Sequence, residues 1–122
     1  MIIRNWRDAT PRVGHDNVVI HDVLGPRGTE GKSRTEAPLG GNWSLTRQML
    51  QPGKVSDEHE HDAMEQVFYF TGGHGQMKLD GELHDVKEGD AVHVPPRCRH
   101  QTLNNSDRWL ELLVISVGLE DG

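Results

Sequence analysis

Short stretches of the chain alternate between apolar and polar residues, and residues 43–49 show the pattern most clearly. Side chains of an extended chain point to opposite faces in turn, so this stretch is predicted to be a β-strand with one mostly apolar face. A Pro-Gly pair at residues 52–53 ends it with a turn. The apolar face holds Trp43, Leu45 and Met49, with Arg47 as its one charged member.

Further strands are predicted where β-branched and aromatic residues cluster between turn residues. Asp80-Gly81 stands between two short stretches and predicts a tight hairpin, because both turn positions need positive φ. Residues 25–41 are rich in glycine, proline and charge, so they are predicted to form a long surface loop or lid. The other expected strands cover residues 17–24, 65–71, 76–79, 82–86, 91–94 and 109–117.

This arrangement of elements indicates the fold class. No stretch has helical periodicity, except for a short turn expected at residues 5–9. About seven to nine short strands, with turn signals about every 8–12 residues, indicate an all-β sandwich or barrel. A chain of 122 residues fits one domain, and we expect residues 1–122 to form a single one.

Charge and cysteine content narrow the class of protein. A formal net charge of −6 argues against binding to nucleic acid or to an anionic membrane, since such proteins usually present a basic face. The sequence has no run of about 18 apolar residues, so no membrane-spanning helix is expected. Cys98 is the one cysteine, so no disulfide can form within the chain. The N-terminus lacks a signal-peptide pattern, and we expect a cytoplasmic protein.

Titratable residues concentrate between residues 57 and 65. His59 and His61 are two positions apart, so on an extended chain they project to the same side. Glu65 follows at the start of the next strand and can turn back to that side, and His100 could supply a third imidazole. Neutral imidazoles and a carboxylate suit a first-row divalent metal ion. The alternative is a solvated turn, which a His-x-His pair in an acidic stretch often forms.

Two short runs of the chain, residues 53–72 and residues 89–104, carry particular residue types at particular spacings. The residues in question are Gly53, His59, His61, Glu65 and Gly72 in the first run, and Gly89, Pro95, His100 and Asn104 in the second. The two runs resemble the two conserved motifs of the cupin family in residue type and spacing. Arg97 is the one departure, because it stands where the second motif has another glycine.

The resemblance implies a double-stranded β-helix, which is a jelly-roll barrel. It implies that the barrel binds one divalent transition metal ion, which could be Fe, Mn, Ni, Cu, Zn or Co. It also implies one or two coordination positions left for water or substrate. Glycine adopts unusual backbone conformations at little cost, so Arg97 puts the local turn in question. The ligands it implies are His59, His61, Glu65 and His100.

Three more side chains are candidates for a role beside the metal. Tyr69 lies four residues after Glu65, so alternation places both on one inward face, where Tyr69 could donate a proton or orient a substrate. A core aromatic is the simpler interpretation of Tyr69. Arg47 and Trp43 would bind substrate if their strand face lines the barrel, with Arg47 pairing to a carboxylate or phosphate. If the strand packs the other way, Arg47 is an ordinary surface cation.

The second motif region holds further candidates. Arg97 and Arg99 could frame an anionic ligand at the mouth of the barrel, although solvated turn charges are the simpler interpretation. Cys98 could influence the metal from behind His100, but a small buried residue is the more usual role for such a cysteine. His93 matches no motif position, and its strand leads toward the metal ligands.

One barrel fold hosts many activities, so the step to function is analogy. We expect a metal-dependent enzyme acting on a small polar or aromatic metabolite, either a dioxygenase or an isomerase or lyase that works by Lewis-acid catalysis. The alternative is a non-catalytic module in which the metal helps to bind a sugar or organic acid. We also expect a homodimer, because small cupins commonly pair through a sheet edge or face, which hides exposed strand edges.

Overall fold

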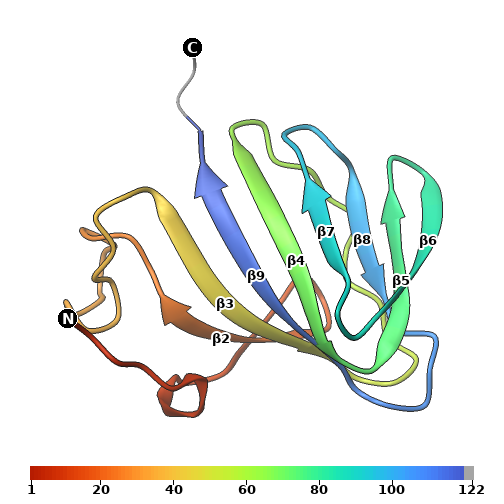
Figure 1. The fold of residues 1–122 in the computed structure, drawn as a ribbon, viewed down its shortest axis with the longest axis horizontal. Coiled ribbons are helices and arrows are strands. Elements are labelled where there is room, and N and C mark those ends of the chain that lie inside the picture. The colour runs from red at the N-terminus through yellow and green to blue at the C-terminus, as the bar shows by residue number, and fades with distance from the viewer. Residues whose placement is uncertain (120–122) are drawn as a thin grey trace.

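The computed structural model describes residues 1–119, and its regular structure is almost all β (Figure 1). A single 3₁₀ turn, η1 (Trp6–Asp8), precedes nine strands within these residues. The strands are β1 (Arg12–Gly14), β2 (Val18–Leu24), β3 (Trp43–Leu50), β4 (Met64–Gly72), β5 (His74–Leu79), β6 (Glu82–Lys87), β7 (Ala91–Val94), β8 (His100–Leu103) and β9 (Leu110–Gly118). No helix among the described residues is long and apolar enough to cross a membrane.

The strands form two antiparallel sheets. The larger sheet has six strands in the order β1-β2-β3-β9-β4-β7, and the smaller has three in the order β6-β5-β8. The segment before β4 adds to the smaller sheet, because Val55 bridges Leu103 and His59 bridges His100. The two sheets enclose the core as a jelly-roll barrel, which confirms the predicted all-β fold class.

Most of the predicted strands are present within a residue or two of their expected bounds. The hairpin turn is confirmed by its backbone, since φ is 47° at Asp80 and 86° at Gly81. The predicted loop at residues 25–41 holds no strand, and a bridge from Pro26 to Leu39 closes it. The sequence pattern did not reveal β1 and β8, which are only three and four residues long.

The core lies between the two sheets. Phe70, Met77 and Leu110 are fully buried there, and each contributes about 2–3 kcal/mol by leaving water. The inward residues of the large sheet alternate with outward ones, as expected for strands. Inward positions include Val18, Ile20, Gln48, Leu50, Gln66, Phe68, Phe70, Leu110, Leu112 and Val114, since these residues join the core or line its cavity.

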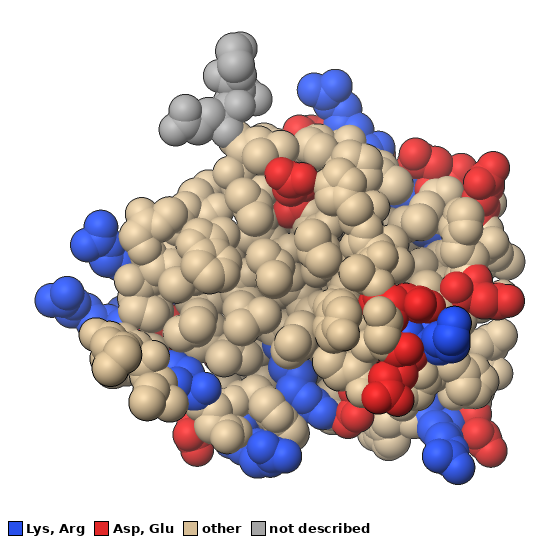
Figure 2. All heavy atoms as spheres, in the orientation of Figure 1, with Lys and Arg blue, Asp and Glu red and all other residues tan. Residues whose placement is uncertain are grey.

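The face of β3 that carries Trp43 and Arg47 is therefore the outer face of the large sheet. Gln48 and Leu50 alternate with it and point inward. In Figure 2, charged side chains lie mostly around the edges of the view, and the centre, over β3, β9 and β4, is mostly uncharged. The large sheet thus has an inner face that forms the core and an outer face that is also rich in apolar residues.

Candidate metal centre

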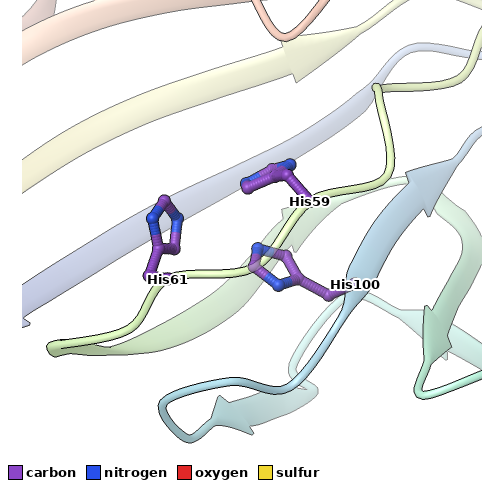
Figure 3. A group of neighbouring side chains, drawn as sticks. All are labelled: His59, His61 and His100. Carbon is purple, nitrogen blue, oxygen red and sulfur yellow. The ribbon is translucent and has the colours of Figure 1, made fainter.

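Three histidines converge at one side of the core. Each of His59, His61 and His100 offers a ring nitrogen, and these atoms lie within 4.8 Å of one another. The ring centroids are 5.0 Å apart for His59 and His61, 4.2 Å for His59 and His100, and 5.7 Å for His61 and His100. Figure 3 shows the three rings turned toward a common space. The structure thus brings three of the four predicted ligands together.

Backbone hydrogen bonds hold these residues in place. The N–H of His59 donates to the carbonyl of His100 at 3.0 Å, and the N–H of His100 donates back at 2.8 Å. The N–H of Arg97 donates to the carbonyl of His61 at 2.7 Å. Arg97 has φ of 63°, the left-handed conformation that a glycine would adopt at lower cost. The backbone therefore keeps the turn conformation expected from the second motif, although the residue there is an arginine rather than a glycine.

The imidazole of His100 is fixed in one orientation. Its Nδ1 donates to the carbonyl oxygen of Cys98 at 2.9 Å, which leaves Nε2 facing the other histidines without a proton. His100 is 1% exposed. Burial lowers the pKa of His100 to about 4, and the hydrogen bond to Cys98 opposes this only in part. Burial also lowers the pKa of His61, with His59 adding to the effect. Both rings are thus held neutral, the form that binds a metal ion.

Asp57 lies beside His59 and joins it to a fourth histidine, His15. The Nδ1 of His15 is hydrogen bonded to Asp57 Oδ1 at 3.1 Å, and the Nδ1 of His59 lies 2.9 Å from the same oxygen, at a poorer angle. The rings of His15 and His59 stack with centroids 4.3 Å apart and planes 10° apart. A carboxylate behind a ligating histidine orients the ring and raises its basicity.

Buried polar atoms without partners test whether this group suits a metal ion. Among the described residues, Nε2 of His61, Nε2 of His100 and Oε1 of Gln66 are buried and accept or donate no hydrogen bond. Leaving such atoms unpaired is costly, and imidazole nitrogens and amide oxygens are both groups that bind divalent metal ions. Gln66, His59 and His100 line one cavity of about 20 Å³, which is room for an ion or a water molecule. The donor set therefore fits a divalent metal ion.

Glu65, the expected fourth ligand, does not lie with the three imidazoles. Its Oε1 lies 2.8 Å from Nε2 of His93 on the outer face of the large sheet, where His93 is exposed. The physical reason is the alternation along β4. Gln66 and Phe68 point inward, so Glu65, the residue before Gln66 in the strand, points outward. The inward position that the resemblance gives to Glu65 is occupied by Gln66.

The other predicted site residues also lie away from the histidines. Tyr69 does share a face with Glu65, as expected, but this is the outer face, and Tyr69 is 45% exposed. Trp43 is 37% exposed on the same side of the sheet. Arg47 is buried there, with Nη2 2.7 Å from Glu111 Oε1 and its guanidinium 3.6 Å from the ring centre of Trp6. The structure thus places Arg47 outside the barrel, in an ion pair rather than in a substrate site.

The segment around the second motif has mainly structural contacts. The side chain of Arg97 is exposed, and that of Arg99 pairs with Glu58 at 3.1 Å. Cys98 is buried in the core cluster, and burial raises the pKa of its thiol. Cys98 therefore acts on the site through its carbonyl oxygen, which holds His100, and as a small buried residue.

Three residues at this site were missed in the sequence. Gln66 could have been found, because the first motif allows three or four residues before its acidic position, and the longer spacing reaches residue 66 and then Gly73. Asp57 and His15 carry no spacing signal. His15 reaches the site because β1 and β2 place the turn between them beside the segment before β4, where the N–H of Asp57 donates to the carbonyl of His15 at 3.1 Å.

Known proteins resemble this chain in sequence. It is 28% identical over 106 residues to an uncharacterised protein of Methanocaldococcus jannaschii, MJ1618, which covers 87% of this chain and 78% of that protein. It is 30% identical over 92 residues to gentisate 1,2 dioxygenase 1 of Aquipseudomonas alcaligenes, which covers 73% of this chain. The match spans only 25% of the dioxygenase.

The fold also matches solved structures. The crystal structure of a protein from Thermotoga maritima, described as a predicted oxalate decarboxylase, superposes with a TM-score of 0.77 at 19% identity. The superposition covers 96% of this chain and 99% of that one. A model of the cupin domain family matches residues 46–116, which include all three converging histidines. The match covers more than half of the sequence, and the chain belongs to the cupin family.

Proposed function

We propose that this protein is a metal-dependent enzyme that acts on a small polar or aromatic metabolite. The observation that carries the proposal is the convergence of His59, His61 and His100 within 4.8 Å, with the buried Nε2 atoms of His61 and His100 left without a partner among the described residues. A purely structural role would leave these atoms unsatisfied in the core at a cost of about 1–3 kcal/mol each.

The ligand set that the contacts favour contains Gln66 in place of Glu65. Gln66 is buried, its Nε2 donates to Ser116 Oγ at 2.9 Å, and its Oε1 is left facing the histidine cavity. Three imidazoles and an amide oxygen are all neutral, so the charge of a bound divalent ion would be only partly offset, by Asp57 behind His59. Such a centre favours a substrate with an anionic oxygen.

A bound redox metal would supply oxygen chemistry, and a non-redox metal would supply Lewis-acid chemistry on a carbonyl. Around it, the residues of this chain have separate tasks. His59, His61 and His100 would hold the ion, and Asp57 would orient His59. His15 lines the same cavity and lies outside the group of His59, His61 and His100, although its ligand atom also lies within 4.8 Å of those of Asp57 and His59. Its place beside the three histidines makes it a candidate to exchange a proton with a substrate. Tyr69 does not line that cavity, because it lies on the outer face of the sheet.

The relatives support a reaction on a small molecule. Gentisate is an aromatic metabolite and oxalate a polar one, and the names of two similar proteins refer to these compounds. Dioxygenase chemistry and isomerase or lyase chemistry both remain within the proposal, since the metal decides between them. The identity of the metal, from Fe, Mn, Ni, Cu, Zn and Co, is the first thing to measure. A cytoplasmic location remains a prediction.

Elemental analysis tests the proposal. We expect about one transition metal ion per chain in protein purified without an affinity tag, and its loss in a His59→Ala/His61→Ala variant. The matched control is His74→Ala/His84→Ala, which removes two exposed histidines outside the site. Fe, Mn or Cu would direct assays to oxygen-dependent reactions, and Zn or Ni to isomerases and lyases. If neither the native protein nor reconstituted protein holds metal, the proposal is wrong.

A non-catalytic binding module is the second candidate, because His15, the one described titratable residue that lines the cavity besides His59 and His100, is already hydrogen bonded to Asp57. About 20 Å³ holds an ion or a water but no metabolite, so a substrate would have to enter from the mouth. The test is to incubate metal-loaded protein with pooled small metabolites and to analyse the bound and free fractions by mass spectrometry. A compound retained but never converted would favour the module, and loss of a compound with appearance of a product would favour the enzyme.

We also propose a homodimer formed through the outer face of the large sheet. Neighbouring outward residues of β3, β9 and β4 form a continuous apolar surface: the register pairs Leu45 and Val67 with Ile115, and Tyr69 with Leu113. Charged residues at its margin already pair within the chain, as Arg47 does with Glu111. An apolar face of this kind on a soluble barrel usually meets a partner.

Sedimentation velocity tests the dimer. We expect Ile115→Lys to convert the dimer to a monomer, while the control Leu83→Lys, on exposed β6, leaves it unchanged. A monomeric native protein at micromolar concentration would contradict the proposal.

A further inference from the structure

A second and larger cavity lies apart from the histidines. Its volume is about 490 Å³, within the range of small-molecule sites. Its walls come from the N-terminal segment, the C-terminal end of β2 and the loop at residues 25–41. None of the converging histidines lines it. Ser44 lines this cavity and Gln48 lines the other, so along β3 the two are roughly 13 Å apart.

The charge of this cavity is opposite to that of the whole chain. The protein has a net charge of −6, yet three basic residues and two acidic ones line the cavity. Arg12 and Asp22 neutralise each other, because the guanidinium donates to both carboxylate oxygens at 2.8 and 3.0 Å. Figure 2 shows Lys and Arg side chains gathered at the left end, where Figure 1 places β2 and the N-terminal segment. The cavity is therefore a locally basic site in an acidic protein.

Arg4 and Lys32 are the cations left available. Neither makes an ion pair with any described residue, and the Nε of Arg4 is buried with no hydrogen-bond partner. Glu36, the remaining acid, accepts hydrogen bonds from the backbone N–H and hydroxyl of Ser33 at 3.0 and 3.1 Å. A buried guanidinium N–H without an acceptor is unfavourable, and a carboxylate is its best-matched acceptor.

The rest of the wall combines apolar residues with the hydroxyl-bearing Thr10, Thr29 and Ser44. Leu24, Pro26 and Ala37 line the cavity, and Ala37 is 4% exposed. A ligand that fits both parts carries one negative charge and a compact apolar body. Arg4 and Lys32 carry two positive charges and Glu36 carries one negative charge, so the cavity has a net charge of +1 once Arg12 and Asp22 cancel. A ligand with one negative charge balances this better than a dianion does.

We propose that this cavity binds a small organic monocarboxylic acid. The carboxylate lies between Arg4 and Lys32, and the apolar part packs on Leu24, Pro26 and Ala37. The site is independent of the metal centre, because the two cavities share no residue. Loss of metal therefore leaves this binding intact.

The test uses metal-free protein, so that its outcome does not depend on the proposed enzyme function. Benzoate is titrated and followed by amide NMR shifts, with uncharged benzamide as the matched compound. We expect benzoate to saturate shifts at Thr10, Leu24 and Ala37. Benzamide should bind about tenfold more weakly or not at all, since it lacks the negative charge that strengthens a hydrogen bond to a guanidinium or ammonium group.

Variants identify the cations. Arg4→Gln and, separately, Lys32→Gln should each weaken benzoate binding about fivefold to tenfold. The control Arg108→Gln, an exposed arginine in the loop between β8 and β9, should leave it within about twofold. The proposal is overturned if benzoate gives no saturable shifts, if both variants bind like the native protein, or if benzamide binds as tightly. Tighter binding of inorganic phosphate than of benzoate would overturn the carboxylate assignment.

Discussion

The two faces of β4 hold different parts of the molecule. Inward, Gln66, Phe68 and Phe70 are buried against the histidine cavity and the core. Outward, Glu65 pairs with His93, and Tyr69 is 45% exposed. Both faces contain apolar residues, so alternation alone tells which residues share a face but not which face is inside. Packing against the smaller sheet decides that, because Phe68 and Phe70 share one buried cluster with Met77 and Val86.

Stability should show the largest contrast between the faces. Phe70→Ala removes a fully buried ring and should lower the free energy of unfolding by about 3–5 kcal/mol. Tyr69→Ala, one position away on the outer face, should lower it by about 1 kcal/mol or less. Urea unfolding followed by tryptophan fluorescence measures both. Equal losses would contradict the assignment of faces.

Metal affinity should show the next contrast. Gln66→Ala should weaken metal binding by about 10–100-fold, and Glu65→Ala should change it by about twofold or less. Competition with a chromogenic chelator, using Zn²⁺ and Mn²⁺, measures the affinities. The reverse order would restore Glu65 as the fourth ligand and would require β4 to rearrange when metal binds.

Two arginines that form ion pairs should differ in how much they stabilise the fold, because Arg47 is buried and Arg12 is exposed. Arg47 is buried under Trp6 and pairs with Glu111, so Arg47→Ala should lower the free energy of unfolding by about 1–3 kcal/mol. Arg12 pairs with Asp22 at an exposed edge, and Arg12→Ala should cost about 1 kcal/mol or less. Thermal and urea unfolding measure both variants. A larger loss in the free energy of unfolding for Arg12→Ala than for Arg47→Ala would contradict this prediction.

A smaller, pH-dependent effect is expected from His21 on the outer face. Burial and the nearby charge of Arg47 lower the pKa of His21. A group with a lowered folded-state pKa stabilises the fold above its unfolded value near 6.5, and this stability is lost as pH falls toward the folded-state pKa. His21→Asn should therefore lose less stability than the native protein between pH 7 and 5. The exposed His84→Asn should follow the native curve, and an identical curve for His21→Asn would contradict the prediction.

Much of the fold was predictable because its signals are local. Asp80-Gly81 specifies its own turn, and the apolar run at residues 109–117, preceded by polar residues and with several β-branched ones, is typical of a buried strand. β8 was missed because it has four residues and its pairing with β5 and with the segment at His59 is not local. Short strands depend on partners distant in sequence, and no pattern within them reveals this.

The site was predictable only in part, for a related reason. His59, His61 and His100 follow from motif spacing, and the structure brings them together. Whether Glu65 or Gln66 points inward depends on where the loop ends and the alternation of β4 begins, and the sequence spacing permits both. His15 and Asp57 meet only through tertiary structure, so no spacing could identify them.

The paired backbone hydrogen bonds between His59 and His100 have a consequence for how metal is taken up. They close a stretch of roughly 40 residues, whose chain entropy costs on the order of 3 kcal/mol. The buried core, whose residues come from both sheets, removes enough apolar surface from water to offset that cost. In small zinc domains the binding energy of the metal is the folding energy. A barrel with its own buried core is expected to fold without the ion, so metals would exchange at a finished site, at a speed set by the entrance rather than by refolding.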